Sequence, residues 1–368
     1  MKIRELVEYL DERFLPVYQE EYDNAGLLVG DPDDDLKGVL ATTDVTPAVI
    51  DEAVQKDCNI IVSHHPLIFG GLKRITTHGE TERMVMRLIR HNICVYAAHT
   101  NLDNLDWGVN GILAEKLRLV DCSILRPVEG ALCKLVTYVP TVDADKLRKS
   151  LFEAGAGCIG NYDSCSWNCE GTGTFRANEG CNPYCGTVGS LHNETETRIE
   201  VVYEKRQEQR LVSRLKESHP YEEPAYDCIP LNNPYLKVGA GMIGRLDNPM
   251  LVADFLTMVK ERLRLPVVRV SKNAVCMKEP TVRKVAVCGG SGSFLIGDAI
   301  GRHADIFLTG DLKYHDFQGA GERIILADIG HYESEQFAKE IFYRVISEKF
   351  SNFVCQISEA DDGFVRYI

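Results

Sequence analysis

The stretch Cys58-Asn59-Ile60-Ile61-Val62-Ser63-His64-His65-Pro66 decides the fold. Its apolar part is short enough for a buried strand, and the polar residues from Ser63 onward end that strand. Short strands and helical segments flank it, at residues 39–41 (strand), 46–56 (helix), 80–90 (helix) and 93–98 (strand). This alternation of strands and helices predicts a parallel sheet with helices on both faces.

The second part of the chain repeats this order. Its expected strands and helix lie at residues 284–287, 305–309, 324–327 and 294–302. Val39 and Ile60 are separated by the same number of residues as Val285 and Ile306. Any two strand–helix–strand units look alike, but the matched lengths favour a degenerate internal repeat. We therefore expect an α/β fold built from two facing halves.

The middle of the chain differs from both halves in composition and in the order of its expected strands and helices, and it predicts a separate α+β domain. The domain boundaries are then residues 1–125, 126–237 and 238–368. Its expected strands and helices are at residues 135–140, 144–154, 198–203, 207–218 and 225–229. The stretch from Gly155 to Gly189 is rich in Gly, Asn and Cys and predicts long loops.

The bulk composition excludes several classes of protein. A chain of 368 residues suits two or three domains, and a net charge of −13 argues against nucleic-acid binding. No stretch approaches the roughly 20 apolar residues of a membrane-spanning helix. The N-terminus, Met1–Leu10, mixes acids into an amphipathic helix, unlike a secretory signal. The odd count of 13 cysteines argues against a disulfide framework. We expect a cytoplasmic protein without membrane contact.

Five side chains that follow strands carry the chemistry. His64 and His65 follow the second strand, and adjacent histidines point in different directions, which suits two metals, although capping is the alternative. Asp103 follows the third strand, and His331 and Glu335 lie four apart on one side of a helix start. Ligand sites sit beyond the carboxyl ends of parallel strands, so these residues should meet. Such sets bind Zn, Fe or Mn, and a carboxylate can bridge two ions.

Other residues have two interpretations each. His99 and His315 are candidates for proton carriers near the metals or for hydrogen-bonded structural histidines. Asp44 and Asp311 could orient ligands or cap turns. The Gly289–Gly292 turn precedes a helix and could bind an anion, but we favour a tight turn as its explanation.

Two cysteine pairs with three intervening residues, Cys165–Cys169 and Cys181–Cys185, raise the question of a third metal site. The usual structural zinc motif has shorter spacing. Loop thiols are the default interpretation.

Over nearly its whole length the chain resembles the Nif-three-like dinuclear metal proteins, also called GTP cyclohydrolase I type 2 homologs. The segments that carry the resemblance are Asp23–Gly30, Ser63–Phe69, His99–Asp103, His219–Asp227, Thr309–His315 and Gly330–Glu335. The resemblance implies that His64, His65, Asp103, His331 and Glu335 hold two divalent metal ions. It also implies a toroidal homohexamer with the sites facing an internal cavity, and a PII/CutA-like insert in the middle region.

Two functions compete at this point. The first is a metal-dependent hydrolase acting on a small nucleotide-like or phosphorylated substrate, with GTP ring opening as one version, although the sequence shows no purine pocket. The second is a non-enzymatic metal-binding, regulatory or metal-carrier protein, which the PII/CutA-like insert motivates. A scaffold with structural metals is a weaker third option.

Overall fold

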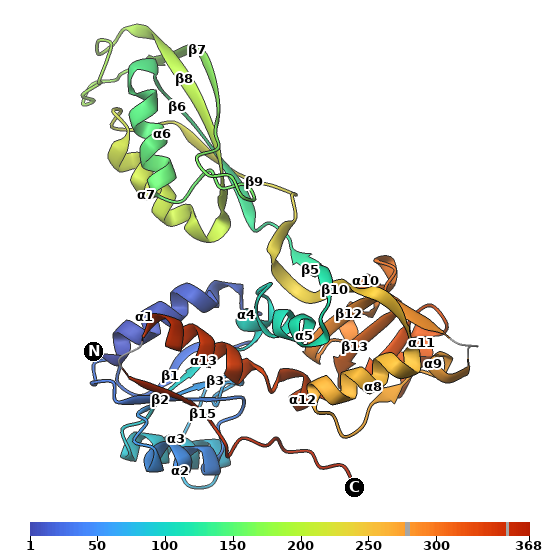
Figure 1. Ribbon diagram of the computed structural model, residues 1–368. Helices are drawn as coiled ribbons and strands as arrows, with labels where there is room; N and C mark the ends of the chain where they lie inside the picture. The colour runs from blue at the N-terminus through green and yellow to red at the C-terminus, as the bar shows by residue number, and fades with distance from the viewer. Residues whose placement is uncertain (277–279, 351–352) are drawn as a thin grey trace. The chain divides into compact units, whose positions relative to one another are not determined.

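The computed structural model describes residues 1–276, 280–350 and 353–368. The chain forms two compact units (Figure 1). The larger unit consists of Met1–Pro127 and Leu236–Ile368, and the smaller unit of Val128–Tyr235. All thirteen cysteines are free thiols.

The first sheet of the larger unit has the strand order β1-β4-β3-β2-β15. These strands are β1 (Gly26–Val29), β2 (Gly38–Thr42), β3 (Ile60–Ser63), β4 (Cys94–Ala97) and β15 (Val354–Ile357). The pairs β4–β3, β3–β2 and β2–β15 are parallel, and β1 is antiparallel to β4. The predicted parallel arrangement is therefore confirmed for the three central strands.

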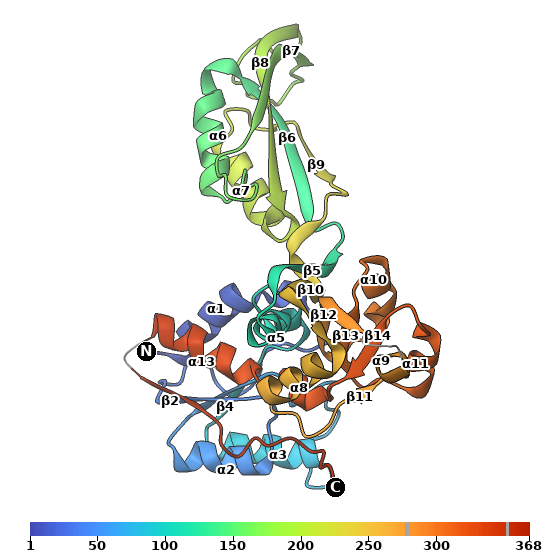
Figure 2. The ribbon, with the colours of Figure 1, turned by 45° about the vertical axis from the view of Figure 1, so that its right-hand side comes forward.

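Helices cover both faces of this sheet. Helices α1 (Ile3–Phe14) and α13 (Ala338–Lys349) lie on one face, and α2 (Pro47–Gln55) and α3 (Glu80–Arg90) on the other (Figures 1 and 2). Every residue of β2, β3 and β4 is buried, which explains why their sequences are continuous apolar runs. The hydroxyl oxygen of Thr46 caps α2 by accepting from the Val49 N–H.

The second sheet of the larger unit has the order β11-β14-β13-β12-β10-β5. Its strands are β5 (Val120–Val128), β10 (Tyr235–Leu251), β11 (Arg269–Val270), β12 (Thr281–Ser291), β13 (Ile306–Gly310) and β14 (Ile325–Asp328). The three expected strands, β12, β13 and β14, are parallel, while β10 and β11 add antiparallel neighbours. Val285 pairs with Ile306 in this sheet as Val39 pairs with Ile60 in the first. The internal repeat itself stays a prediction.

The remaining helices of the larger unit pack around the second sheet or join the two sheets. They are α4 (Thr100–Asp103), α5 (Val109–Leu117), α8 (Val252–Leu263), α9 (Asn273–Cys276), α10 (Ile296–Gly301), α11 (Tyr314–Ala320) and α12 (His331–Glu335). Residues from α10 and α11 form one apolar cluster with Ala286, Phe307 and Leu326 of the sheet. The carboxyl ends of the central strands lead directly into α4 and α12.

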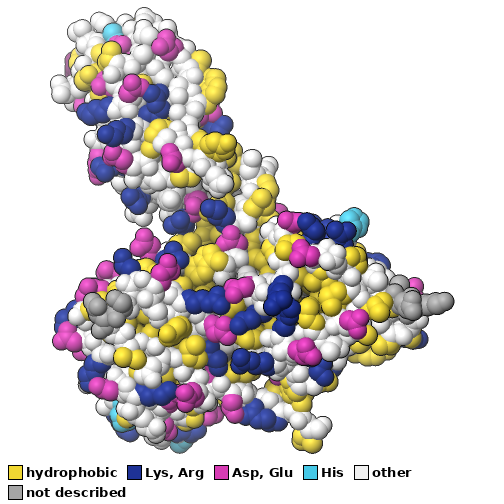
Figure 3. Space-filling view, in the orientation of Figure 1, with side chains coloured by type: hydrophobic (Ala, Val, Ile, Leu, Met, Phe, Trp, Pro, Cys, Tyr) yellow, Lys and Arg dark blue, Asp and Glu magenta, His cyan; other side chains and the backbone are white. Residues whose placement is uncertain are grey.

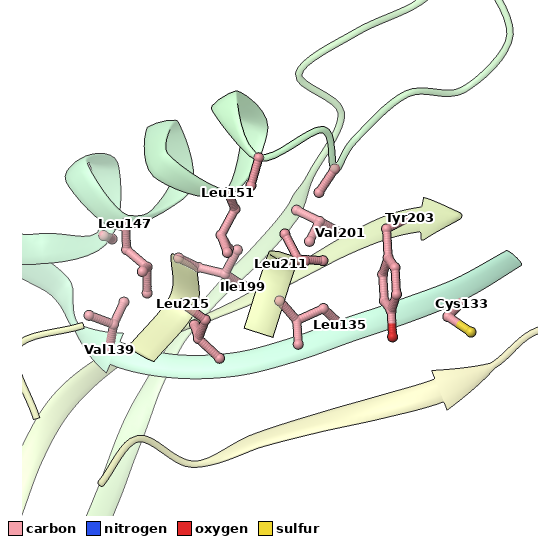
Figure 4. Packing of buried hydrophobic residues seen from close by; sticks show 13 residues of the cluster. Cys133, Leu135, Val139, Leu147, Leu151, Ile199, Val201, Tyr203, Leu211 and Leu215 are labelled. Atoms are coloured by element: carbon pink, nitrogen blue, oxygen red, sulfur yellow. The ribbon is translucent and has the colours of Figure 1, made fainter. Parts of the chain in front are cut away.

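The smaller unit is a four-stranded antiparallel sheet with two helices on one face. The order is β7-β8-β6-β9, and the elements are β6 (Leu132–Pro140), β7 (Trp167–Arg176), β8 (Leu191–Glu204), β9 (Tyr226–Pro230), α6 (Ala144–Glu153) and α7 (Glu208–Ser218). Leu147 and Leu151 of α6 pack with Leu211 and Leu215 of α7 over Ile199 of the sheet (Figure 4). This apolar cluster is the core of the unit.

One prediction for this region is wrong. The stretch from Gly155 to Gly189 was expected to form long loops, but residues Trp167–Arg176 form strand β7. It pairs with β8 along its full length, from Trp167 opposite Glu200 to Arg176 opposite Leu191. Most of its side chains are exposed, so the strand has no apolar pattern, and only the hydrogen bonds to β8 define it.

The face shown in Figure 3 carries mixed charge, with Lys and Arg side chains interspersed with Asp and Glu. Among the described residues, no helix is long and apolar enough to cross a membrane.

Candidate metal centre

The carboxyl ends of strands from both sheets of the larger unit meet at one place. His64 and His65 directly follow β3, and His99 precedes α4, at whose end Asp103 lies. His331 and Glu335 are the first and last residues of α12, which follows β14. The structure thus brings together all five residues that the sequence singles out as metal ligands. With His99, we call these six residues the His/carboxylate cluster.

Glu335 lies at the centre of this cluster. Its Oε2 is 2.9 Å from Nε2 of His65 and 3.1 Å from Nε2 of His331. Its Oε1 is 3.7 Å from Nε2 of His64, and this same nitrogen is 3.5 Å from Oδ1 of Asp103. The two oxygens of one carboxylate therefore face two different sets of donors. His64 is fully buried, and Glu335 is 2% exposed.

Three groups within the cluster have the spacing of metal ligands. In each group, one donor atom per residue lies within 4.8 Å of the others, and the groups are His64–Asp103–Glu335, His65–His331–Glu335 and His64–His65–His99. Imidazole nitrogens with carboxylate oxygens suit Zn, Fe or Mn. The cluster can therefore hold metal ions.

Two buried atoms of the cluster lack a hydrogen-bond partner, which tests whether a metal fits. These atoms are Nε2 of His64 and Oδ1 of Asp103. Leaving a buried polar atom unsatisfied costs about 1–3 kcal/mol. A cation bound by both atoms would remove this cost. The residues present therefore fit a metal ion.

The histidines are held with one nitrogen facing the cluster, because each Nδ1 has a partner elsewhere. The Nδ1 partners are the Ala98 carbonyl for His64 (2.9 Å), Asp44 for His65 (2.8 Å), Asp23 for His99 (2.8 Å) and Asp311 for His331 (2.6 Å). Carbonyls and carboxylates only accept, so Nδ1 must donate. The Nε2 lone pair is then free to bind a metal, the arrangement usual for metal-ligating histidines.

The Nδ1 contacts show what the aspartates near the cluster do. Asp44 and Asp311 orient histidines, which was one of the two interpretations for them. Asp23 performs the same task for His99, and sequence reasoning assigned it no role. Its only signal was its place in a segment shared with the family. Burial would raise the pKa of Asp23, but hydrogen bonds from His99 and Thr100 outweigh it and hold that pKa well below its usual value.

His99 and His315 differ in position. The ring centroid of His99 lies 5.3 Å from that of His64 and 5.4 Å from that of His65. His315 is exposed near the start of α11, and its Nδ1 is 3.1 Å from Oε1 of Gln318. None of the possible ligand groups among the described residues includes His315. The structure therefore brings His99, but not His315, into the cluster.

The surroundings of three proposed ligands raise their pKa values and so favour the protonated form of each side chain. Burial lowers the pKa of His65, but hydrogen bonds to Asp44 and Glu335 outweigh it and raise the pKa to about 10. The hydrogen bond to Glu335 raises the pKa of His331 to about 9. Burial raises the pKa of Asp103 to about 6. Metal binding must therefore displace protons, which makes its affinity pH-dependent.

The glycine turn after β12 approaches the cluster closely. A Cβ on Gly290, whose φ is +61°, would lie 2.2 Å from Oε1 of Glu335. The amides of the turn are already used, since the N–H groups of Gly289, Gly290 and Gly292 donate to Asn110, Ser334 and Thr309, each at 2.9 Å. The turn therefore allows close approach of the backbone to Glu335, and the anion-binding alternative for it is not supported.

The fold and the cluster define an α/β protein with a buried set of histidines and carboxylates that could hold metal ions. The sequence model of the family described as Duf34/NIF3 (NGG1p interacting factor 3) matches residues 1–362. The chain belongs to this family.

Similar proteins support this membership. A Bacillus subtilis protein named GTP cyclohydrolase 1 type 2 homolog is 40% identical over 336 residues, which cover 90% of this chain and 88% of that protein. A Mycobacterium tuberculosis protein of the same name is 35% identical, covering 91% and 88%. The crystal structure of a Bacillus cereus protein related to NIF3 matches with a TM-score of 0.84 at 34% identity, covering 100% of this chain and 99% of that one.

Proposed function

We propose that the larger unit binds two divalent metal ions, of zinc, iron or manganese, through His64, His65, Asp103, His331 and Glu335. The observation that carries this proposal is the position of Glu335, whose Oε2 faces His65 and His331 while its Oε1 faces His64. A carboxylate placed between two donor sets can bridge two ions.

We further propose that the protein is a metal-dependent hydrolase of a small nucleotide-like or phosphorylated substrate, and GTP cyclohydrolase-type activity is one version of this. Two bound ions would polarise a substrate oxygen and lower the pKa of a water molecule. His99, tied through Nδ1 to Asp23, is the residue suited to holding a proton beside the reacting atoms. The name of the relatives supports the GTP version.

The second candidate is a metal carrier or regulatory protein. The middle region motivates it, because the family resemblance implies a PII/CutA-like module there, and such modules resemble small-ligand and metal sensors. A carrier has to load and release its ions. A carrier should therefore pass metal to a competing chelator within minutes, while a catalytic site should retain it through many turnovers.

The decisive experiment combines metal analysis with a substrate screen on the full-length protein. Wild type should contain two ions per chain, Glu335→Gln should contain almost none, and His331→Asn should keep only the ion of the His64 set. His91→Asn, at an exposed histidine of the same unit, is the matched control and should resemble wild type. If His331→Asn loses as much metal as Glu335→Gln, the shared-carboxylate arrangement is wrong.

The screen uses GTP, other nucleotides, phosphomonoesters and phosphodiesters. A turnover present in wild type and His91→Asn but lost in Glu335→Gln supports the hydrolase. Full metal content with no turnover of any compound, together with rapid transfer to a chelator, supports the carrier.

We also infer from the family resemblance that the protein assembles as a homohexamer in the cytoplasm and that its middle region is a PII/CutA-like insert. Light scattering should give six times the mass of one chain. A monomer or dimer would contradict this part without affecting the metal proposal.

A further inference from the structure

The smaller unit contains a second, different group of potential ligands. The donor atoms of Cys185, His192 and Glu194 all lie within 4.8 Å of one another, and all three residues are partly buried. Nε2 of His192 and Oε2 of Glu194 are 2.8 Å apart. We call these three residues the Cys185 cluster. It adds a thiol to an imidazole and a carboxylate, whereas the His/carboxylate cluster has no cysteine among its members.

The fold brings these three donors together from one strand and the loop before it. His192 and Glu194 are two residues apart on β8, so their side chains project to the same side. Cys185 lies in the loop that leads from β7 into β8. Gly186 lets this loop approach the strand, because a Cβ there would lie 2.9 Å from Cγ of His192, and its φ is +81°. The close approach of Cys185 is therefore built into the backbone.

Strand β7 leaves room beside the carboxylates of β8. Gly173 pairs with Glu194, and a Cβ on Gly173 would lie 2.0 Å from Oε2 of Glu196. Phe175 pairs with His192, and their ring centroids are 5.3 Å apart. The absence of a side chain on Gly173 makes room for the Glu196 carboxylate next to the proposed ligands, and the phenyl ring packs edge-on against the imidazole.

The charges around the Cys185 cluster favour a cation. Glu194 pairs with His192, and within the part of the chain that the structure describes no Lys or Arg forms a salt bridge with Glu194 or Glu196. The hydroxyl of Tyr221 donates to Glu196 at 2.8 Å and lies 3.6 Å from Sγ of Cys185. Phe175, Glu196 and Tyr221, which lie beside the cluster, also line a cavity of about 580 Å³.

We propose that Cys185, His192 and Glu194 bind a third metal ion, a borderline-soft divalent cation such as Zn²⁺. A thiolate with an imidazole selects zinc over magnesium, calcium or manganese, which prefer oxygen ligands. Three protein donors leave one coordination position for water. Cys181 is not a ligand in this proposal, because the donor atoms close to Cys185 belong to His192 and Glu194 of β8.

Cobalt substitution tests this site without interference from the His/carboxylate cluster. Co²⁺ is added to metal-stripped full-length protein, and the near-ultraviolet thiolate-to-cobalt charge-transfer band is recorded. Only a cysteine ligand gives this band. Wild type should show it, Cys185→Ser should lose it, and Cys158→Ser, at an exposed cysteine of the same unit, should keep it. Glu335→Gln should also keep it, so this proposal stands or fails independently of the proposed function.

A second variant guards against misfolding of the first. His192→Asn retains the thiol but removes one donor, and its affinity for Co²⁺ should fall by at least the roughly 10–100-fold that loss of a partner to a ligand costs. Far-ultraviolet circular dichroism should be unchanged in both variants. No band in wild type, or an equal band in Cys185→Ser, would show that the cluster is only a hydrogen-bonded network and overturn the proposal.

Discussion

The two ligand clusters differ in how the chain assembles them. The Cys185 cluster is local, since its three residues come from one strand and the loop before it. The His/carboxylate cluster joins strand ends of two sheets, with Glu335 and His65 hundreds of positions apart in sequence. The first cluster is partly exposed, with His192 at 28% and Glu194 at 26%, so water can satisfy its groups. In the second, His64 and Glu335 are buried, so these two groups need partners inside the cluster or a cation.

This difference shows where each cluster is vulnerable. In the His/carboxylate cluster, the Nδ1 of every histidine has a fixed partner and Glu335 is held by the imidazoles of His65 and His331, so a small displacement affects several contacts at once. In the Cys185 cluster, side chains can move into solvent. The following predictions test this contrast, beginning with the largest expected effect.

Gly290→Ala should abolish metal binding in the larger unit. The added Cβ meets Oε1 of Glu335, a buried side chain whose Oε2 is held by His65 and His331. The positive φ adds about 1–3 kcal/mol of strain. Metal content and thermal unfolding measure both effects. Gly297→Ala is the control, since nothing lies within 4 Å of its new Cβ. Normal metal content in Gly290→Ala would mean that the Glu335 carboxylate can move away from the added Cβ and still bind metal.

Glu52→Gln should destabilise the larger unit without removing metal. Glu52 accepts hydrogen bonds from Ser358 and from the backbone N–H groups of Glu359 and Ala360, which ties the end of the chain to α2. Burial would raise its pKa, but these bonds and Lys56 lower the pKa from 4.5 to about 2. The contribution is therefore present above about pH 4.5 and is lost as the pH falls towards 2.

We expect a loss of about 2–3 kcal/mol in the free energy of unfolding at pH 7. Urea unfolding of wild type and variant at several pH values gives this difference, which should shrink below pH 4.5. Glu12→Gln, at an exposed site, should change stability by less than about 0.5 kcal/mol. A difference that is constant down to pH 2.5 would contradict the role of the ionised carboxylate.

Asp44→Ala should weaken metal binding by roughly 10–100-fold while leaving the fold intact. Asp44 fixes the tautomer and orientation of His65, and without it Nε2 no longer points steadily at Glu335. Competition with a chelator measures the affinity. Asp33→Ala, which removes an exposed partner of Arg4, serves as the control. Unchanged affinity in Asp44→Ala would show that packing alone orients His65.

Gly173→Ala in the smaller unit should have the smallest effect, within about 1 kcal/mol of wild type. Its Cβ also meets a carboxylate oxygen, that of Glu196, but this side chain is only partly buried and can rotate. Gly173→Ala and Gly290→Ala thus make the same chemical change next to a glutamate that can rotate, Glu196, and next to one that is held in place, Glu335. Equal losses of stability in the two variants would remove the contrast between the clusters.

Sequence reasoning succeeded where a residue's environment is set by its neighbours along the chain. The buried strands β2, β3 and β4 appear as apolar runs, and the polar residues that follow them mark strand ends, so the meeting of His64, His65, Asp103, His331 and Glu335 could be predicted. Strand β7 could not, because its side chains are exposed and its strand character comes from pairing with β8. Strands β10 and β11, which lie on either side of the three expected strands of the second sheet, were also missed.

The sequence by itself determined the α/β alternation, the separate middle region, the family and the residue types that could ligate metal, since all of these depend on local pattern. Only the tertiary structure decided that Glu335 lies between two donor sets, that Asp23, Asp44 and Asp311 hold histidines, and that Cys185 meets His192. These are contacts between residues brought together by packing. Their geometry depends on the closure of whole sheets and loops, which no local stretch of sequence specifies.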